Sequence, residues 1–205
     1  VRYADDLIIL VGSHSSAKRV NRSVVDFIET RMKLKVNREK SRLCFPLDLN
    51  YLGHSFNKDG FWTAFELPLI QDGDEPSYQK ANSPIRITYF DKKTRKATKE
   101  FAYQLDPITK PYVGDYNLNG LTDILEFKPN HFIVIERTYQ SEKGTQGNTI
   151  NLFHAWIEKT STNTLAINSL KQTDFIPLKK ELVFSFDTVK NKLTEKIDNV
   201  LLMLS

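Results

Sequence analysis

The feature that most constrains the fold is a series of short apolar segments that fills the chain beyond about residue 62. Each has six to nine residues, is rich in β-branched and aromatic side chains, and is bounded by turn residues such as DKKTRK, KPN or SEKGTQGN. Such segments are typical of β-strands, and helical periodicity is nearly absent between residues 63 and 186. The pattern predicts an all-β region of antiparallel strands, either a sandwich or propeller blades. The expected strands span residues 85–90, 99–105, 121–127, 131–136, 149–157 and 181–186.

The first 62 residues have a different pattern. RYADDLIILV predicts a β-hairpin with Asp5 and Asp6 at its tip, and NYLGHSFNKDGFW predicts another that NKDG closes. Between them, apolar residues of 17–32 recur at spacings of one, three and four, which predicts a basic amphipathic helix of roughly five turns. The sequence therefore predicts an α+β composite: a small ββαββ segment over residues 1–62, then an all-β segment over residues 63–205.

Composition narrows the class of protein. The chain of 205 residues is 40% hydrophobic and 26% charged, which is typical of globular domains. No run of 18 apolar residues is present, so no membrane partner is expected. No basic-then-apolar signal pattern opens the chain, so as given it is expected in the cytoplasm. One cysteine, Cys44, excludes an internal disulfide and a cysteine-cluster metal site.

The net charge of +4 is unevenly distributed. Residues 1–62 hold 11 Lys and Arg against 7 Asp and Glu, and the remaining residues hold 18 of each. All of the basic excess therefore lies in the first segment, where it could contact a phosphate backbone. An excess of this size over 62 residues is also compatible with ordinary scatter.

The first segment carries YADD between apolar strands, then the basic helix, LKVNREKSRL and YLGHSF. In this order and spacing, residues 1–62 resemble the palm of a group II intron-encoded reverse transcriptase, or maturase. The resemblance implies that Asp5 and Asp6 bind catalytic Mg²⁺, a hard cation that prefers carboxylate oxygens, and that RNA or DNA is the partner. It places Tyr3 beside the primer end and Lys40 near the incoming triphosphate.

Polymerisation requires two cations, held by a third carboxylate as well as this pair. The family supplies that aspartate from an earlier strand, and no counterpart precedes residue 1 in the sequence as given. We therefore expect little or no polymerase activity from this chain alone.

The second segment contains five stretches that resemble another family, described as having the esterase-like activity of phytase. They are ELPLIQDGDEP, IRITYFDKKTRKATKEFAYQLDP, LTDILEFKPNHFIVIERTY, NTINLFHAWI and KKELVFSF, within residues 64–201. The resemblance implies a β-propeller, here partial and usually exported, that hydrolyses phosphate esters or other esters.

Glu136 and Arg137 are the candidate catalytic pair of the second segment. An arginine fork suits phosphate or carboxylate, and a neighbouring acid could bind a cation or move a proton. Adjacent residues of a strand point to opposite faces, so at most one of them enters a given pocket unless the strand ends there. An edge salt bridge or a buried structural pair remains the alternative.

Other acidic and histidine residues are weaker candidates. Asp72, Asp74 and Glu75 could bind Ca²⁺ through carboxylate oxygens, although a solvated loop is the favoured interpretation. His131 and His154 stand on expected strands without the spacing of metal ligands, and we interpret them as structural.

Two functional hypotheses follow. In the favoured one the chain is a fusion of a polymerase palm remnant with a phytase-like ester hydrolase segment, and the β segment is the functional part. In the alternative the chain is a nucleic-acid-binding remnant of an intron-encoded reverse transcriptase, without catalysis.

Overall fold

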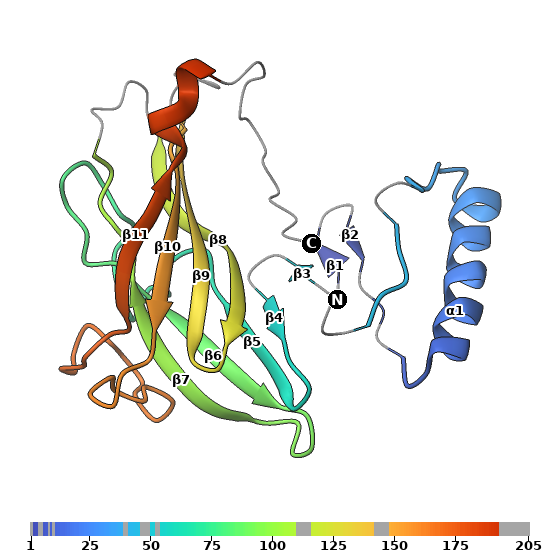
Figure 1. Ribbon diagram of the computed structural model, residues 1–205, viewed down its shortest axis with the longest axis horizontal. Coiled ribbons are helices and arrows are strands. Elements are labelled where there is room, and N and C mark those ends of the chain that lie inside the picture. Colours follow the sequence, from blue (N-terminus) through green and yellow to red (C-terminus); the bar gives the residue numbers. More distant parts are fainter. Residues whose placement is uncertain are drawn as a thin grey trace. The chain divides into compact units, whose positions relative to one another are not determined.

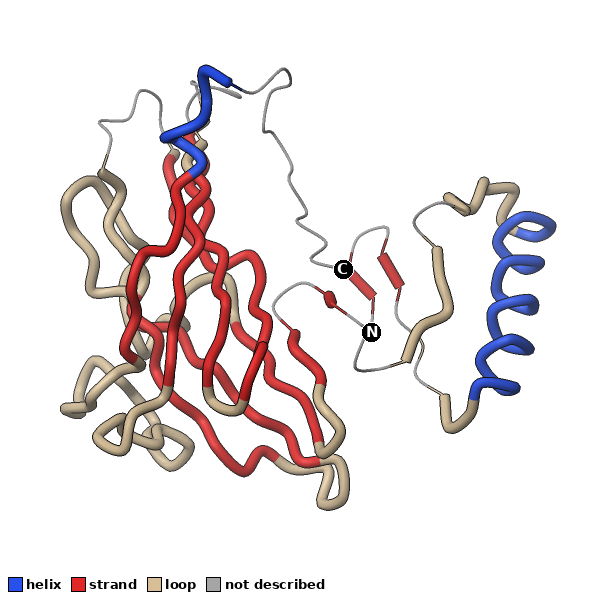
Figure 2. Tube along the Cα trace, in the orientation of Figure 1, coloured by secondary structure: helices blue, strands red, loops and turns tan. Residues whose placement is uncertain are grey.

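The computed structural model describes residues 2–3, 6–7, 9, 11–38, 41–45, 50–51, 54–109, 116–141 and 148–192 (Figure 2). The chain forms two compact units, Val1–Phe45 and Pro46–Ser205. Asp5 and Lys40, two of the residues predicted to act in polymerisation, lie outside the described residues. For Tyr3 and Asp6 the backbone alone is described.

The first unit contains a short hairpin and one long helix. Strands β1 (Arg2–Tyr3) and β2 (Asp6–Leu7) pair in antiparallel fashion, with Tyr3 opposite Asp6. Helix α1 (His14–Asp26) continues into the π-helical turn η1 (Phe27–Arg31). Ser13 caps α1, because its hydroxyl oxygen accepts a hydrogen bond from the Ser16 N–H at 3.2 Å. The predicted hairpin and helix are both present in the backbone.

The second unit begins with a five-stranded antiparallel sheet in chain order. The tight turn between its second and third strands is held by the Asn57 side chain, which accepts a hydrogen bond from the Gly60 N–H at 2.9 Å. NKDG therefore closes a hairpin, as predicted. The strands are β3 (Asn50–Tyr51), β4 (His54–Phe56), β5 (Gly60–Ala64), β6 (Pro84–Asp91) and β7 (Ala97–Gln104).

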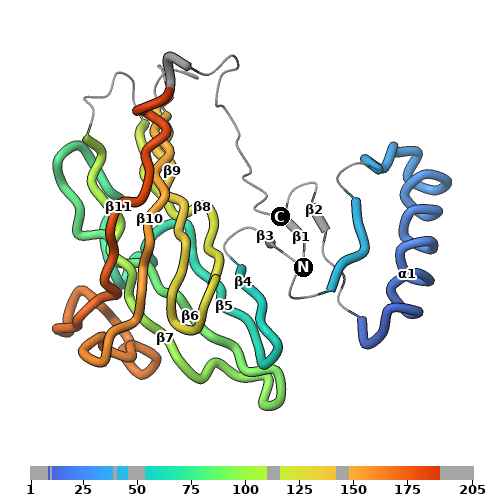
Figure 3. The backbone as a smooth tube through the Cα atoms, in the orientation of Figure 1, coloured from blue at the N-terminus to red at the C-terminus, as the bar shows by residue number. Residues whose placement is uncertain are grey.

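A second antiparallel sheet follows, again with its strands in chain order, and Figure 3 traces the backbone through both sheets. All six strands expected beyond residue 62 are present, as β6 to β11. No strand begins or ends more than four residues from the predicted position. The strands of this sheet are β8 (Asn117–Lys128), β9 (His131–Gln140), β10 (Ile150–Trp156) and β11 (Lys179–Ser185), followed by the 3₁₀ turn η4 (Phe186–Lys192) (Figure 1).

The hydrophobic core of the second unit takes side chains from both sheets. Trp62, which is 1% exposed, lies at its centre, with ring centroids 5.0 Å from Tyr89 and 5.1 Å from Phe132. Burial of large aromatic side chains supplies much of the stability of such a core. The core residues are Trp62, Ile85, Ile87, Tyr89, Phe101, Tyr103, Leu105, Leu121, Ile124, Phe132, Val134, Phe153, Ala155 and Leu178.

The compact units divide between Phe45 and Pro46, whereas the sequence suggested a junction at residues 62 and 63. That junction falls inside β5, where Trp62 pairs with Tyr89 of β6. The β4–β5 hairpin, assigned from sequence to the end of the palm-like segment, is therefore part of the sheet that continues into β6 and β7. Cross-strand pairing and core burial of Trp62 explain this placement.

The face of β6 and β7 opposite the core is covered by two connecting segments. Arg86 lies on that face and donates to both carboxylate oxygens of Asp72, at 2.6 and 2.7 Å, and to Glu100 at 2.6 Å. It also donates to the Ile167 carbonyl at 2.9 Å. The network ties residues 65–83 and 157–178 to the sheet. Among the described residues, no helix is long and apolar enough to cross a membrane.

Candidate functional site

Glu136 places a carboxylate at the end of the core between the two sheets. It follows Phe132 and Val134 on one face of β9 and is only 1% exposed. An ionised carboxylate removed from water is strongly destabilising unless it is paired and hydrogen-bonded. Its neighbours therefore decide what Glu136 does.

Four groups donate hydrogen bonds to this carboxylate. The Tyr103 hydroxyl and the Lys180 ammonium donate to Oε1, each at 2.7 Å. The Asn119 side-chain amide and the Asp106 backbone N–H donate to Oε2, at 2.7 and 3.1 Å. The donors come from β7, β8, β11 and the segment that follows β7, so the cluster connects both sheets.

Lys180 contacts a second carboxylate, Asp106, at 2.7 Å. Its ammonium also lies over two aromatic rings, 4.8 Å from the centroid of Tyr103 and 4.3 Å from that of Phe153. Such cation–π contacts stabilise a partly desolvated ammonium. The three charged side chains become steadily more exposed, at 1% for Glu136, 17% for Lys180 and 43% for Asp106.

The cluster fixes the protonation of Tyr103. Burial raises the pKa of the Tyr103 phenol well above its usual value, and the negative charges of Glu136 and Asp106 raise it further. The phenol therefore stays protonated and donates to Glu136. The formal charges of Glu136, Lys180 and Asp106 sum to one net negative charge.

Arg137, the other member of the predicted pair, does not enter this cluster. It is the next residue of β9, opposite Gly120 of β8 and Ile150 of β10. Strand alternation therefore turns it to the other face of the sheet. Only Glu136 of the pair faces the core, as the alternation argument allows.

Asp72 and Asp74 belong to different ion pairs, and Glu75 is exposed. Asp72 is 1% exposed and accepts from Arg86 and from the Leu170 N–H, while Asp74 accepts from Lys171 at 2.7 Å. Burial alone would raise the pKa of Asp72, but the hydrogen bonds and charge of Arg86 and the Leu170 N–H hold it below its usual value. Within the part of the chain that the structure describes, no three His, Cys, Asp or Glu side chains converge as metal ligands.

Sequence reasoning missed Tyr103, Asp106, Asn119 and Lys180. A weak signal exists for Lys180, since it alternates with Leu182 on the face of KKELVF that pairs with Phe153 and Ala155. The other three are ordinary residues of a strand, a loop and a strand. Nothing in their own surroundings indicates that Glu136, at least 17 residues away, is their partner.

The fold and this cluster define a protein of two antiparallel sheets in which a buried glutamate, a lysine and a half-exposed aspartate form a linked group at one end of their common core. The chain matches the phytase-like family, described as esterase-like activity of phytase, over residues 53–202. That match covers 150 of the 205 residues, and the chain belongs to this family. It contains β4 to β11 entirely, whereas residues 1–52 lie outside it. No curated protein and no solved structure matches the chain.

Proposed function

We propose that the second unit hydrolyses an ester, and that the reaction takes place at the cluster around Glu136 and Lys180. Membership of a family described by esterase-like activity supports the class of reaction. The observation that carries the choice of site is Lys180, held between a buried and a half-exposed carboxylate. A positioned cation beside a solvent-facing base is the arrangement that ester hydrolysis needs.

Each charged residue has a distinct role in this proposal. Asp106, the most exposed, accepts a proton from water as the water oxygen bonds to the acyl carbon or phosphorus of the ester. Lys180 donates a hydrogen bond to the oxygen on which negative charge develops. Glu136 holds the ammonium in place and is a positioning residue. The ester bond then breaks, and the alcohol oxygen leaves with the proton that Asp106 accepted from the water.

The charge of the cluster separates two substrate classes. One net negative charge repels a phosphate dianion and leaves an uncharged carboxylic ester unaffected. A phosphate monoester would need a further cation, such as an added Ca²⁺ ion, to offset this charge. We therefore expect carboxylic esters to be cleaved without metal, and phosphate esters to be cleaved only when Ca²⁺ is added.

Hydrolysis of p-nitrophenyl acetate and p-nitrophenyl phosphate by the full chain, with Ca²⁺ or with a chelator, tests the proposal. In Lys180→Met and Asp106→Asn, kcat/KM should fall by about 10²-fold or more, the usual loss when an oxyanion donor or a general base is removed. Lys179→Met, on the opposite face of β11, is the matched control and should retain activity. No hydrolysis of either substrate under any metal condition, or equal rates in all variants, would refute it.

We further propose that the two sheets are consecutive blades of a β-propeller. Each contains a four-stranded meander in chain order, β4 to β7 and β8 to β11, and the two share one core. Propellers are built from four-stranded antiparallel blades packed in this way. A crystal structure that places the two sheets back to back without a common central axis would contradict this.

For the first unit we propose binding to RNA or DNA through the phosphate backbone. Residues 1–45 hold 10 Lys and Arg against 5 Asp and Glu, so the excess of +5 lies within this unit. A shallow groove along α1 is lined by the basic residues Lys18, Arg22 and Arg38 and by the acidic residues Asp26 and Glu29. Arg38 is paired with Glu29 at 2.7 Å, so Lys18 and Arg22 are the basic residues of the groove that would contact phosphate. Retention on RNA should fall steeply as salt rises, because each such contact releases counterions. Absent or salt-insensitive retention would reject this proposal.

The assignment of residues 1–62 to a reverse-transcriptase palm, with Mg²⁺ on Asp5 and Asp6, remains a prediction from sequence. Primer extension by the full chain in Mg²⁺ is its direct test. We expect no extension, and extension that is lost in Asp6→Asn would show that the metal site is functional.

A further inference from the structure

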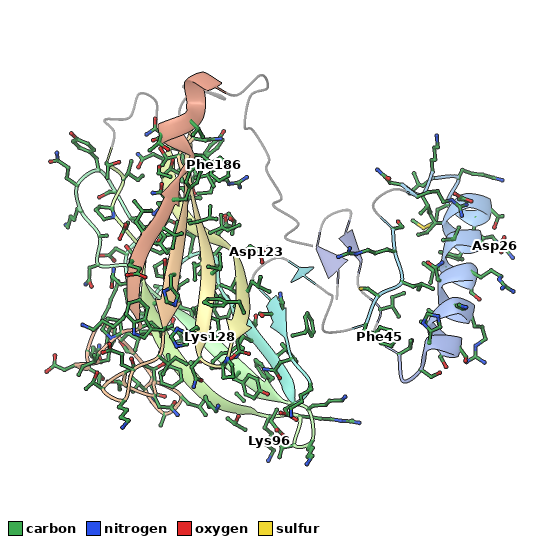
Figure 4. All side chains as sticks on the ribbon, in the orientation of Figure 1. Asp26, Phe45, Lys96, Asp123, Lys128 and Phe186 are labelled. Carbon is green, nitrogen blue, oxygen red and sulfur yellow. The ribbon has the colours of Figure 1, made fainter. Side chains whose placement is uncertain are left out.

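His131 and His154 lie together on the outer face of the second sheet, the face turned away from Phe132 and Phe153. His131 is paired with Trp156 of β10, and His154 is paired with Ile133 of β9, so the two histidines are diagonal neighbours across these strands. Their closest ring nitrogens, Nδ1 of His131 and Nε2 of His154, are 2.9 Å apart. Lys128, labelled in Figure 4, lies opposite His131 on β8.

A carboxylate sets the tautomer of this pair. Nδ1 of His154 lies 3.1 Å from Oε1 of Glu181, the residue opposite it on β11. A carboxylate accepts, so His154 donates its Nδ1–H, and in the neutral imidazole Nε2 then carries the lone pair. Nδ1 of His131 then donates to that lone pair.

We propose that Nδ1 of His131 and Nε2 of His154 are the protein ligands of one divalent transition-metal ion, with Cu²⁺ bound most tightly. Metal–imidazole bonds are about 2.0–2.1 Å long. Two nitrogens 2.9 Å apart therefore subtend an angle of about 90° at the metal, whereas a tetrahedral site would separate them by about 3.3 Å. An angle near 90° with nitrogen ligands suits tetragonal Cu²⁺ or Ni²⁺ better than Zn²⁺.

The surroundings of the two rings support this assignment. Histidine ligands usually donate their second ring N–H to a carboxylate, which is the role of Glu181 toward His154. The His154 ring centroid lies 5.5 Å from that of Phe127 and 4.8 Å from that of Trp156, so aromatic neighbours restrict its rotation. Ligands that are held in advance lose less entropy when the ion binds.

The protonation states also suit a metal ligand. Partial burial lowers the pKa of His131, and the charge of Lys128 and the neighbouring His154 lower it further. This shift favours the neutral imidazole, the form that binds a metal ion. On binding, its proton moves from Nδ1 to Nε2, so the ion takes up both lone pairs without net proton release.

Two features set the strength of this site. Solvent molecules complete the coordination, since the described residues supply only these two nitrogens at this position. The positive charge of Lys128 opposes the ion. The site is on the opposite face of the sheet from Glu136 and Lys180. Loss of metal binding and loss of ester hydrolysis are therefore separate outcomes.

Titration of the full chain with Cu²⁺ at pH 7.5, in glycine as a competing ligand, tests the proposal by calorimetry and electron paramagnetic resonance. We expect one tightly bound ion per chain, with a tetragonal spectrum showing nitrogen coupling. The chain has four histidines, so the double variant His14→Gln/His54→Gln is the matched control and should bind as the parent does. His131→Gln and His154→Gln should each weaken binding at least about tenfold.

Two further variants keep both histidine ligands, so that a change in affinity does not depend on how the protein folds without one of the histidines. Glu181→Gln should weaken binding by about 10- to 100-fold, as losses of second ring-nitrogen partners do. Lys128→Met should strengthen it, because the opposing charge is removed. Unchanged affinity in His131→Gln and His154→Gln, loss of binding in the His14/His54 control, or unchanged affinity in both Glu181→Gln and Lys128→Met would overturn the proposal.

Discussion

At the scale of single residues, Glu136 shows what a sequence pattern can and cannot predict. Strand alternation correctly limits the Glu136–Arg137 pair to one residue on the core face. The partners of Glu136 depend on pairings over long distances in the chain, since Tyr103 is 33 residues away and Lys180 is 44. No local pattern carries that information. The site therefore emerges only when both sheets are formed.

Glu136→Gln should lower the free energy of unfolding by about 3 kcal/mol, because it leaves a largely buried ammonium with one of its two carboxylates. Urea unfolding followed by tryptophan fluorescence measures the change. Glu75→Gln, at an exposed position, is the control and should stay within about 0.5 kcal/mol of the parent. Equal stabilities of the two variants would show that the buried contact contributes nothing.

Asp72 makes stability depend on acid pH. Its pKa is lowered in the folded state by Arg86 and the Leu170 N–H, despite burial that acts in the other direction. A depressed pKa stabilises the fold above the unfolded-state pKa of about 3.9, and that contribution is lost as pH falls through the folded value. Unfolding free energies between pH 6 and 2.5 should decline below about pH 4. The decline should be shallower in Asp72→Asn, and an identical slope would contradict this origin.

At the scale of elements, strands were predictable and the segments between them were not. The β-branched and aromatic runs identify six strands of the second unit, because their composition is a local property. Their register is not local. His131 and His154 are 23 residues apart and lack ligand spacing in sequence, yet strand pairing brings their ring nitrogens to 2.9 Å. The covering role of residues 157–178 likewise depends on Arg86, which the strand pattern gave no reason to single out.

Arg86→Met should loosen residues 157–178. Arg86 donates a hydrogen bond to the carbonyl oxygen of Ile167, and it also positions Asp72, which accepts a hydrogen bond from the Leu170 N–H. The remaining Asp72 and Glu100 carboxylates would be buried without their cation. Brief digestion with thermolysin, followed by mass spectrometry, should show faster cleavage within this segment. Lys92→Met, in the exposed turn after β6, is the control. Cleavage first at another place would show that Arg86 does not hold the segment.

At the scale of the whole molecule, the two compact units differ in both charge and packing. The first holds the excess of positive charge, and the second holds the hydrophobic core. Residues 1–45 carry an excess of five positive charges, and the remaining residues carry one more negative than positive charge. All core residues belong to the second unit, and so does the family match over residues 53–202. The sequence alone indicated both the uneven distribution of charge and the change from a mixed helix and strand pattern to a series of short β-strands. It set the boundary at residue 62 because the β4–β5 hairpin also fitted the palm pattern.

Two truncated chains distinguish these boundaries. A fragment of residues 46–205 retains every core residue and every strand from β3 to β11, so it should unfold cooperatively with nearly the midpoint of the full chain. A fragment of residues 63–205 lacks Trp62, all of β4 and three of the five residues of β5, which leaves β6 largely as an unpaired edge.

Loss of a buried tryptophan alone typically removes about 3–5 kcal/mol, from a total of about 5–15 kcal/mol for a domain. The shorter fragment should therefore be unfolded or aggregated, as circular dichroism and thermal melts would show. If it instead melts like the longer fragment, β4 and β5 do not belong to the folding unit of the phytase-like family. The junction suggested by the sequence would then be the physical one.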